Sequence, residues 1–119
     1  MSNERKPALS LAAVPGRRQR TVDLAAEIER RGFSGIFCPS LGDAMSLCLS
    51  IAHVTETIEF GTAIQPIYFQ HPSALAGTAG FINEIAGGRF RLGLGVTHGP
   101  VHARMGFEVG TPLSDMRDY

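Results

Sequence analysis

The sequence predicts an α/β fold in which strands and helices alternate along the chain and the strands form a parallel sheet. Strand-like patterns occupy residues 8–14, 34–38, 58–64 and 90–96, and helix-like patterns occupy residues 22–31, 43–55 and 72–86, with a fourth helix beginning near Leu113. This alternation indicates right-handed crossovers, in either an open doubly wound sheet or a closed barrel. A length of 119 residues, 44% of them hydrophobic and 18% charged, suits one globular domain.

The first strand and helix carry local signals that agree with each other. Leu9, Leu11 and Ala13 alternate through the first strand, and the helix over 22–31 is expected to begin after Thr21 as its N-cap and to stop at Gly32. The apolar run in the first strand is too short for a secretion signal, so we expect a cytoplasmic protein. No apolar segment approaches the ~20 residues that cross a bilayer.

The next two helices differ in their composition. The helix over 43–55 is apolar nearly all round, which predicts a position between neighbouring elements and also allows a contribution to an oligomer interface. The helix over 72–86 begins with Pro72, where a missing N–H costs nothing, and it ends at the pair Gly87 and Gly88.

The fourth strand has one apolar face and one nearly bare face. Its apolar residues alternate with Arg91, Gly93 and Gly95. A face without side chains lets a flat ligand approach or relieves crowding between backbones, and we favour the packing interpretation. The dinucleotide pattern G-x-G-x-x-G fails because His98 stands where the third glycine belongs, and the sequence contains no P-loop motif.

Charge and cysteine content exclude several classes of function. Eleven basic and eleven acidic residues give a net charge of zero, without the footprint of a nucleic-acid binder. Arg17, Arg18 and Arg20 form a local basic cluster, which we interpret as a solvated loop, with anion binding as the alternative. Cys38 and Cys48 lack metal-ligand spacing and are expected to be reduced and buried.

Polar and aromatic residues gather in four loops at the carboxyl ends of the strands, where ligands bind in both candidate folds. These loops cover residues 15–19, 39–43, 65–71 and 97–102, and they contain His71, His98 and His102. The histidines lack the spacing of a metal site, so we expect no metal. We expect His98 to transfer protons or contact a cofactor, or else to be a solvated loop residue, whereas His53 on the second helix is structural.

Two segments carry a resemblance to a known family. They are residues 58–72, IEFGTAIQPIYFQHP, and residues 87–96, GGRFRLGLGV, and the similarity extends from the first strand to the closing segment 112–119. The chain resembles the bacterial-luciferase-like monooxygenases. This resemblance implies parallel (β/α) units of a TIM barrel and an oxidoreductase that uses reduced FMN or the F420-type deazaflavin coenzyme, for hydride transfer to a small organic substrate or for its monooxygenation.

The resemblance also implies individual site residues. In deazaflavin-using members, a bulge with a non-prolyl cis peptide lies against the cofactor ring, and the matching positions here are Ala63, Ile64 and Gln65, with the cis bond between the first two. Thr97 and His98 match a second cofactor-contacting loop, and His98 is the candidate catalytic residue.

Further positions complete the candidate site. Pro39 and Ser40 stand where many relatives have an aspartate or histidine near the cofactor, a departure that leaves the choice of cofactor open. Tyr68 and His71 are expected on the substrate side.

The length departs from the family pattern, because a complete barrel needs ~250 residues. We therefore expect residues 1–119 to be about the first four of eight (β/α) units, with residues 1–7 as a flexible N-terminus. Such a half-barrel is a fragment, an incomplete product, or a half that pairs with another chain through its exposed strand edges. Two hypotheses follow: an enzyme of this class, or a non-catalytic assembly module. A flavodoxin-like sheet that binds an anion is a weaker third.

Overall fold

A computed structural model describes residues 5–106 and 108–119. Four parallel strands form the main sheet in the order β1-β2-β3-β5, and two shorter strands, β4 and β6, form a second parallel pair. The strands are β1 (Lys6–Ser10), β2 (Phe33–Cys38), β3 (Glu59–Thr62), β4 (Gln65–Pro66), β5 (Phe90–Arg91) and β6 (Leu94–Gly95). The helices are α1 (Arg18–Arg30), α2 (Ala44–Val54), the 3-10 turn η1 (Ile67–Phe69), α3 (Pro72–Ile85), α4 (Gly99–Met105) and α5 (Pro112–Asp118).

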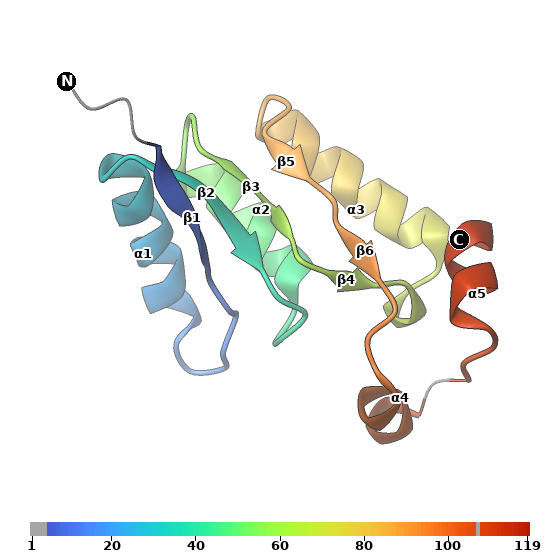
Figure 1. The fold of residues 1–119 in the computed structure, drawn as a ribbon. Helices are drawn as coiled ribbons and strands as arrows, with labels where there is room; N and C mark the ends of the chain where they lie inside the picture. The colour runs from blue at the N-terminus through green and yellow to red at the C-terminus, as the bar shows by residue number, and fades with distance from the viewer. Residues whose placement is uncertain (1–4, 107) are drawn as a thin grey trace.

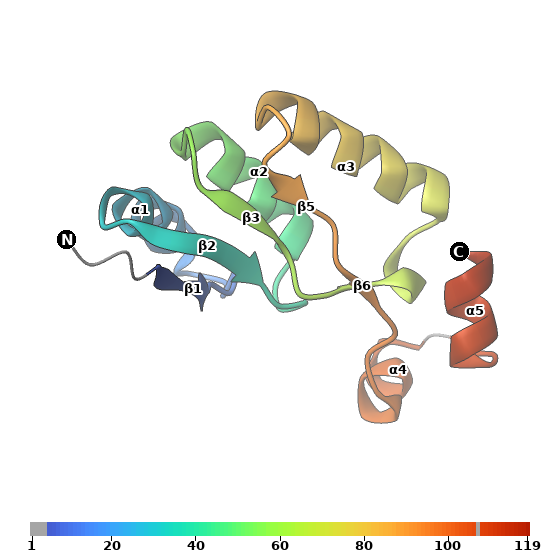
Figure 2. The same ribbon diagram turned by 45° about the horizontal axis from the view of Figure 1, so that its top comes forward.

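The three long helices cover one face of the sheet. Figures 1 and 2 show α1, α2 and α3 side by side on that face, with α2 in the middle, whereas no helix of the described residues covers the opposite face. Helices α4 and α5 lie beyond the β4–β6 pair, and the described chain extends over 51 × 29 × 26 Å. Each strand pairs with the next in the sheet, and each long helix packs against the next one.

The strand register places one apolar row under the helices. Leu9 pairs with Ile36, Ile36 with Phe60, and Phe60 with Phe90, so four apolar side chains cross the sheet in a line. The Phe60 and Phe90 rings are 5.7 Å apart between centroids. The opposite face carries the row Ser10, Phe37, Gly61 and Arg91.

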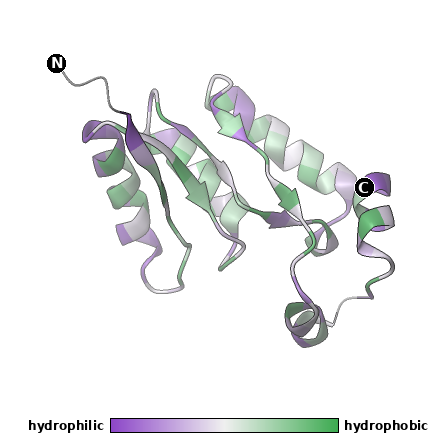
Figure 3. Cartoon of the chain, viewed as in Figure 1, coloured by the Kyte–Doolittle hydropathy of each residue, from purple (hydrophilic) through white to green (hydrophobic). Residues whose placement is uncertain are grey.

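Helix α2 buries more residues than either neighbour, as its composition predicts. Figure 3 shows pale to hydrophobic residues along most of α2 and hydrophilic residues at the ends of α1. The buried residues of α2 are Ala44, Met45, Leu47, Cys48, Ile51 and Ala52, against two each in α1 and α3. No helix of the described residues is long and apolar enough to cross a membrane.

The predicted boundaries of the first unit are wrong. Helix α1 begins at Arg18, and Thr21 lies in its first turn, where the hydroxyl donates to the Arg17 carbonyl instead of capping the helix. The Arg18 side chain donates from Nε to the Ala13 carbonyl and from Nη2 to the Gly42 carbonyl, so a long-range contact supports the additional turn. Arg18 therefore joins two loops, and the basic cluster is not a purely solvated one.

The first strand is also displaced towards the N-terminus. Strand β1 covers Lys6–Ser10 and not residues 8–14. The expected flexible N-terminus, residues 1–7, lies partly outside the described residues, whereas Lys6 and Pro7 already belong to β1.

The strand predicted over 34–38 is β2, but the last two predicted strands are interrupted. Within residues 58–64 only β3 forms, and β4 follows at Gln65–Pro66 after a break, whereas residues 90–96 contain both β5 and β6 with a break between them. Backbones approach each other so closely there that a Cβ at Gly61 would collide with the Arg91 carbonyl oxygen, and one at Gly93 would collide with the Thr62 carbonyl oxygen. The bare glycine face therefore serves backbone packing, as expected.

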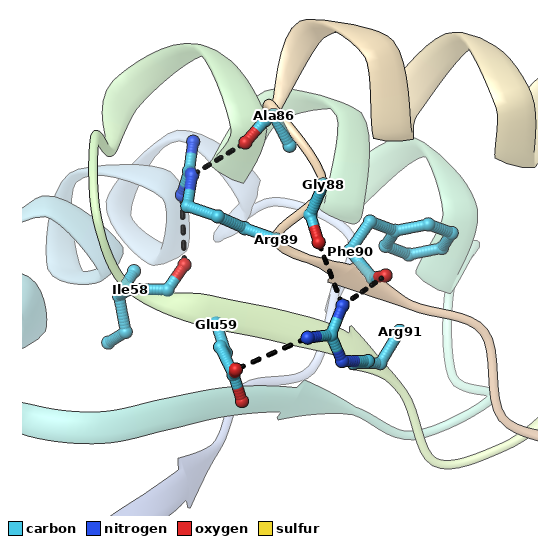
Figure 4. A network of polar contacts seen from close by, with 7 residues as sticks. All are labelled: Ile58, Glu59, Ala86, Gly88, Arg89, Phe90 and Arg91. Atoms are coloured by element: carbon cyan, nitrogen blue, oxygen red, sulfur yellow. Dashed lines mark hydrogen bonds and ion pairs between the residues drawn. The ribbon is translucent and has the colours of Figure 1, made fainter.

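Arg89 joins helices to the sheet at the amino ends of the strands. Its Nε donates to the Ala86 carbonyl (2.8 Å), and its Nη atoms donate to the carbonyls of Ile58 (2.9 Å) and Thr55 (3.1 Å) and to the Thr55 hydroxyl (2.9 Å). Figure 4 shows this half-buried side chain between the end of α3 and the start of β3. Arg91 points to the opposite face, where it pairs with Glu59.

Glu29 ties α1 to the segment before β3. Its carboxylate accepts hydrogen bonds of 2.8–3.1 Å from the backbone N–H groups of Glu56, Thr57 and Ile58. Partial burial by itself raises the pKa of the Glu29 carboxyl, but these backbone hydrogen bonds outweigh burial and hold the pKa below its ordinary value. The ionised carboxylate is thus part of the folded structure at neutral pH.

Candidate active-site cleft

A cleft lies at the carboxyl ends of β2 and β4. It has a volume of about 460 Å³ and is lined by Ser40, Asp43, Ala44, Gln65, Phe69, Gln70 and Met105. An adjoining hollow of about 320 Å³ shares Ser40, Asp43, Phe69 and Met105 and extends the cleft along α4. Hollows of this size, with apolar walls and a few polar groups, are typical of small-molecule sites.

The cleft combines apolar walls with polar groups at one side. Phe69 from η1 and Met105 from α4 supply the apolar surface, while Ser40 and the buried Gln65 supply polar groups. Asp43 is committed to the fold, because its carboxylate accepts hydrogen bonds from the Ser46 N–H (3.1 Å) and hydroxyl (2.6 Å) and so caps α2. The cleft can therefore hold a flat, partly polar molecule, but Asp43 does not offer it an unengaged base.

The β3–β4 connection leads directly into Gln65, which lines the cleft. The peptide bond between Ala63 and Ile64 is cis, as the family resemblance predicts. The Ala63 N–H donates to the Cys38 carbonyl (2.9 Å), and the Gln65 N–H donates to the Gly93 carbonyl (2.7 Å). Ala63 is exposed, whereas a Cβ at Gly95 would collide with the Ile64 side chain. The connection thus presents a small residue to solvent and an apolar one to β6.

The structure brings some of the predicted cofactor residues together and separates others. Ser40 and Gln65 line the cleft, and Pro39 adjoins Ser40 in the chain. Thr97 and His98 follow β6 at the same edge of the molecule but line neither hollow. Thr97 has a positive φ of 57° and its hydroxyl donates to the Val96 carbonyl, while His98 is the exposed N-cap residue of α4.

The two predicted substrate residues, Tyr68 and His71, make structural contacts and line neither hollow. The Tyr68 hydroxyl donates to Asp115 Oδ2 in α5 (2.7 Å). Partial burial, followed by the hydrogen bond and negative charge of Asp115, raises the pKa of Tyr68, so the phenol stays protonated. His71 caps α3, because its Nδ1 accepts from the Ser73 N–H (3.2 Å). Both rings therefore orient backbone elements around the cleft.

His102 is a residue whose role the sequence analysis missed. Residues 97–102 were expected to form a loop, but α4 begins at Gly99 and ends before Gly106, which has a positive φ of 72°. The His102 Nε2 contacts the Val96 carbonyl, and the ring packs edge-on against Tyr68 at 5.1 Å. Pro100 at the start and Gly106 at the end were the signals for this helix. His102 anchors α4 and with it the Met105 wall of the cleft.

The residues Cys38, Cys48 and His53 do not line the cleft. Cys38 and Cys48 are buried and reduced, as expected. The hydrogen bond with Cys38, followed by burial, raises the pKa of Cys48 far above its ordinary value, so the Cys48 thiol is not activated. His53 is exposed on α2. In the described part of the chain, no three His, Cys, Asp or Glu side chains are placed to hold a metal ion.

The fold matches solved flavin and deazaflavin enzymes. The F420-dependent tetrahydromethanopterin reductase of Methanopyrus kandleri has a TM-score of 0.81 at 20% identity, over 97% of this chain and 38% of that one. The oxygenating constituent of 3,6-diketocamphane monooxygenase from Pseudomonas putida, solved with FMN, has a TM-score of 0.79 at 19% identity, over 96% of this chain and 37% of that one. This likeness confirms the expected (β/α) units of the TIM-barrel kind.

Sequence comparisons point the same way. A 5,10-methylenetetrahydromethanopterin reductase of Archaeoglobus fulgidus is 36% identical over 73 residues, or 61% of this chain and 22% of that protein. An uncharacterized protein of Mycobacterium tuberculosis is 28% identical over 109 residues, or 90% of this chain and 32% of that protein. The chain thus spans 22–32% of the length of these curated relatives. A family model described as luciferase-like monooxygenase matches residues 2–119, and the chain therefore belongs to the luciferase-like monooxygenase family.

Proposed function

We propose that this chain forms the cofactor-facing part of an oxidoreductase that uses reduced FMN or the F420-type deazaflavin coenzyme. The observation that carries this proposal is the cleft at the carboxyl ends of β2 and β4, whose lining residue Gln65 directly follows the cis-linked Ala63–Ile64 segment. Relatives with this fold include an F420-dependent reductase and a monooxygenase solved with FMN. The proposed reaction is hydride transfer to a small organic substrate or its monooxygenation.

The residues of the cleft fit the ring system of such a cofactor. The exposed Ala63 leaves room for a flat ring on the β3–β4 connection, and Phe69 and Met105 offer apolar contacts to it. Ser40 and Gln65 supply hydrogen-bonding groups at the polar side. A bound reduced flavin or deazaflavin supplies the hydride, and the protein supplies orientation and exclusion of water.

The other predicted residues have proposed roles around this ring. Pro39 and Ile64 would shape its surroundings. The β4–β6 register, in which Gln65 faces Leu94, directs Thr97 and His98 to the same edge of the molecule. His98 would contact the cofactor and carry a proton on its imidazole, which is accessible to solvent. Tyr68 and His71 would bound the substrate side.

A binding titration tests the proposal directly. The folded chain is titrated anaerobically with reduced FMN and, separately, with reduced F420, and binding is followed by fluorescence and calorimetry. We expect saturable binding of one cofactor, weakened in Gln65→Leu and unchanged in His53→Ala, a change on the exposed surface of α2. If the folded wild-type chain binds neither cofactor, the proposal is contradicted.

The alternative function is a non-catalytic assembly module. It is favoured by the uncovered sheet face, which presents Phe37, and by β1, which pairs with β2 and with no other strand of residues 5–106 and 108–119. We propose that the chain associates with itself through such strand edges, because unpaired edges are templates for further pairing. Sedimentation velocity tests this idea: a monomer at all concentrations would contradict self-association without affecting the cofactor proposal.

A further inference from the structure

Thr62 lies between two strand pairings: that of β3 with β5, which ends at Gly61, and that of β4 with β6, which begins at Gln65. It is the last residue of β3 and is 4% exposed. Its hydroxyl donates to the Gly93 carbonyl (2.8 Å) and accepts from the Gly93 N–H (3.0 Å). Gly93 lies in the gap between β5 and β6. One buried side chain therefore satisfies the Gly93 N–H and adds a second hydrogen bond to the Gly93 carbonyl.

The register shows what this contact spans. Gly61 pairs with Arg91 before the gap, and Gln65 pairs with Leu94 after it. Residues 62–64 thus face residues 92–93, so the strand that contains Ala63 and Ile64 carries one additional residue. This arrangement is a β-bulge, a feature that interrupts the backbone ladder and changes the direction of the following side chains.

The Thr62 hydroxyl replaces the missing ladder hydrogen bonds at this bulge. The Gly93 carbonyl accepts from the Thr62 hydroxyl and also from the Gln65 N–H, so it holds the bulge at both ends. A side chain at position 93 would collide with the Thr62 carbonyl oxygen, which means that the close approach requires glycine there. Thr62 and Gly93 therefore form a pair that clamps the segment between them.

We propose that Thr62 is a positioning residue whose hydroxyl holds the Ala63–Ile64 bulge in place and so positions Gln65, which follows the bulge and lines the cleft. This inference rests on the proposed function only for its consequence, which is that loss of the hydroxyl weakens cofactor binding. The placement of the bulge itself is independent of any ligand.

The test compares Thr62→Val, which keeps the shape and removes the hydroxyl, with Thr62→Ser, which keeps the hydroxyl. Thr78→Val is the matched control, because it removes a threonine hydroxyl that donates to the Ala74 carbonyl within α3. Amide hydrogen exchange of Gly93 and Gln65 is measured by NMR in each folded variant. We expect exchange at least about tenfold faster in Thr62→Val, and near wild-type exchange in the serine variant and the control.

Titration with reduced FMN and reduced F420 supplies the second readout. Where wild type binds, we expect affinity about tenfold weaker in Thr62→Val but retained in Thr62→Ser. Unchanged exchange in Thr62→Val would overturn the positioning role, and unchanged affinity would overturn its consequence for binding. Where wild type binds neither cofactor, the proposed function fails, and the exchange rates still decide the role of Thr62.

A second pair of variants tests the proposal in case the valine substitution prevents folding. If Thr62→Val does not fold, Thr62→Ser is compared with Thr62→Cys, which has a similar size but a weaker hydrogen-bonding group. Faster exchange in the cysteine variant would support the proposal, and equal exchange in the two variants would overturn it.

Discussion

Replacing Arg89 with alanine is expected to destabilise the fold by about 3–5 kcal/mol. Among the described residues Arg89 has no carboxylate partner, so the loss comes from its hydrogen bonds to backbone carbonyls. Three of its hydrogen bonds to carbonyl oxygens are 3.1 Å or shorter. A hydrogen bond from a charged donor contributes about 1.5–3 kcal/mol, and water at the helix ends recovers part of the loss. The guanidinium also lies 5.4 Å from the centre of the Phe60 ring. The expected loss is large beside a typical stability of about 5–15 kcal/mol.

Urea denaturation followed by circular dichroism measures this loss. The control is Arg91→Ala, two residues away, where the Arg91 and Glu59 side chains are 55% and 52% exposed. An exposed ion pair is worth about 0–1 kcal/mol, and water replaces the hydrogen bonds that this exposed side chain donates to the Gly88 and Phe90 carbonyls. The control is therefore expected to unfold at nearly the wild-type urea concentration. Arg89→Lys keeps the charge but loses the planar fork and is expected to lie between the two. Equal midpoints for the Arg89 and Arg91 alanine variants would refute the reasoning.

Two further predictions concern backbone crowding and pH. Gly61→Ala is expected to destabilise the fold by about 1–3 kcal/mol, because the added Cβ would collide with the Arg91 carbonyl in β5. Gly77→Ala on α3 places its Cβ in open space and is expected to stabilise the fold by up to about 1 kcal/mol. Thermal melts that rank the two variants in the opposite order would contradict this. Glu29→Gln is expected to cost about 1–2 kcal/mol at neutral pH. Because folding lowers the pKa of Glu29, the stabilisation from its carboxylate is present above the ordinary pKa of 4.5 and is lost as the pH falls through the lower folded value. The melting temperatures of wild type and Glu29→Gln should therefore converge in acid. A difference that stays constant with pH would contradict this prediction.

Most of the fold could be predicted because its signals are local. Pro72, the glycines at 87 and 88, and the apolar composition of α2 mark helices through their immediate neighbours in the chain. The start of α1 could not be predicted in this way. It depends on the Arg18 guanidinium reaching the Gly42 carbonyl, 24 residues away in the sequence. The strand breaks likewise arise where two backbones meet, which no single segment reveals.

The candidate site was only partly predictable for the same reason. The family resemblance indicated Ser40 and Gln65, which line the cleft, and the cis bond, which directly precedes Gln65. Its apolar walls, Phe69 and Met105, come from η1 and α4, and their meeting depends on tertiary packing. The roles of Thr97 and His98 stay predictions, since neither residue lines the cleft.

The pairing of each unit with its neighbour bears on how the chain reaches its folded state. Successive strands adjoin in the sheet and successive long helices adjoin above it, so most of the close packing joins segments that are made one after another. In repeat proteins, such an arrangement lets structure nucleate in one unit and spread to the next. The same logic allows the β1–α1–β2 unit to form during translation and to serve as a template for β3, which in turn pairs with β5. Arg89 joins this assembly only after α2, β3 and α3 are in place.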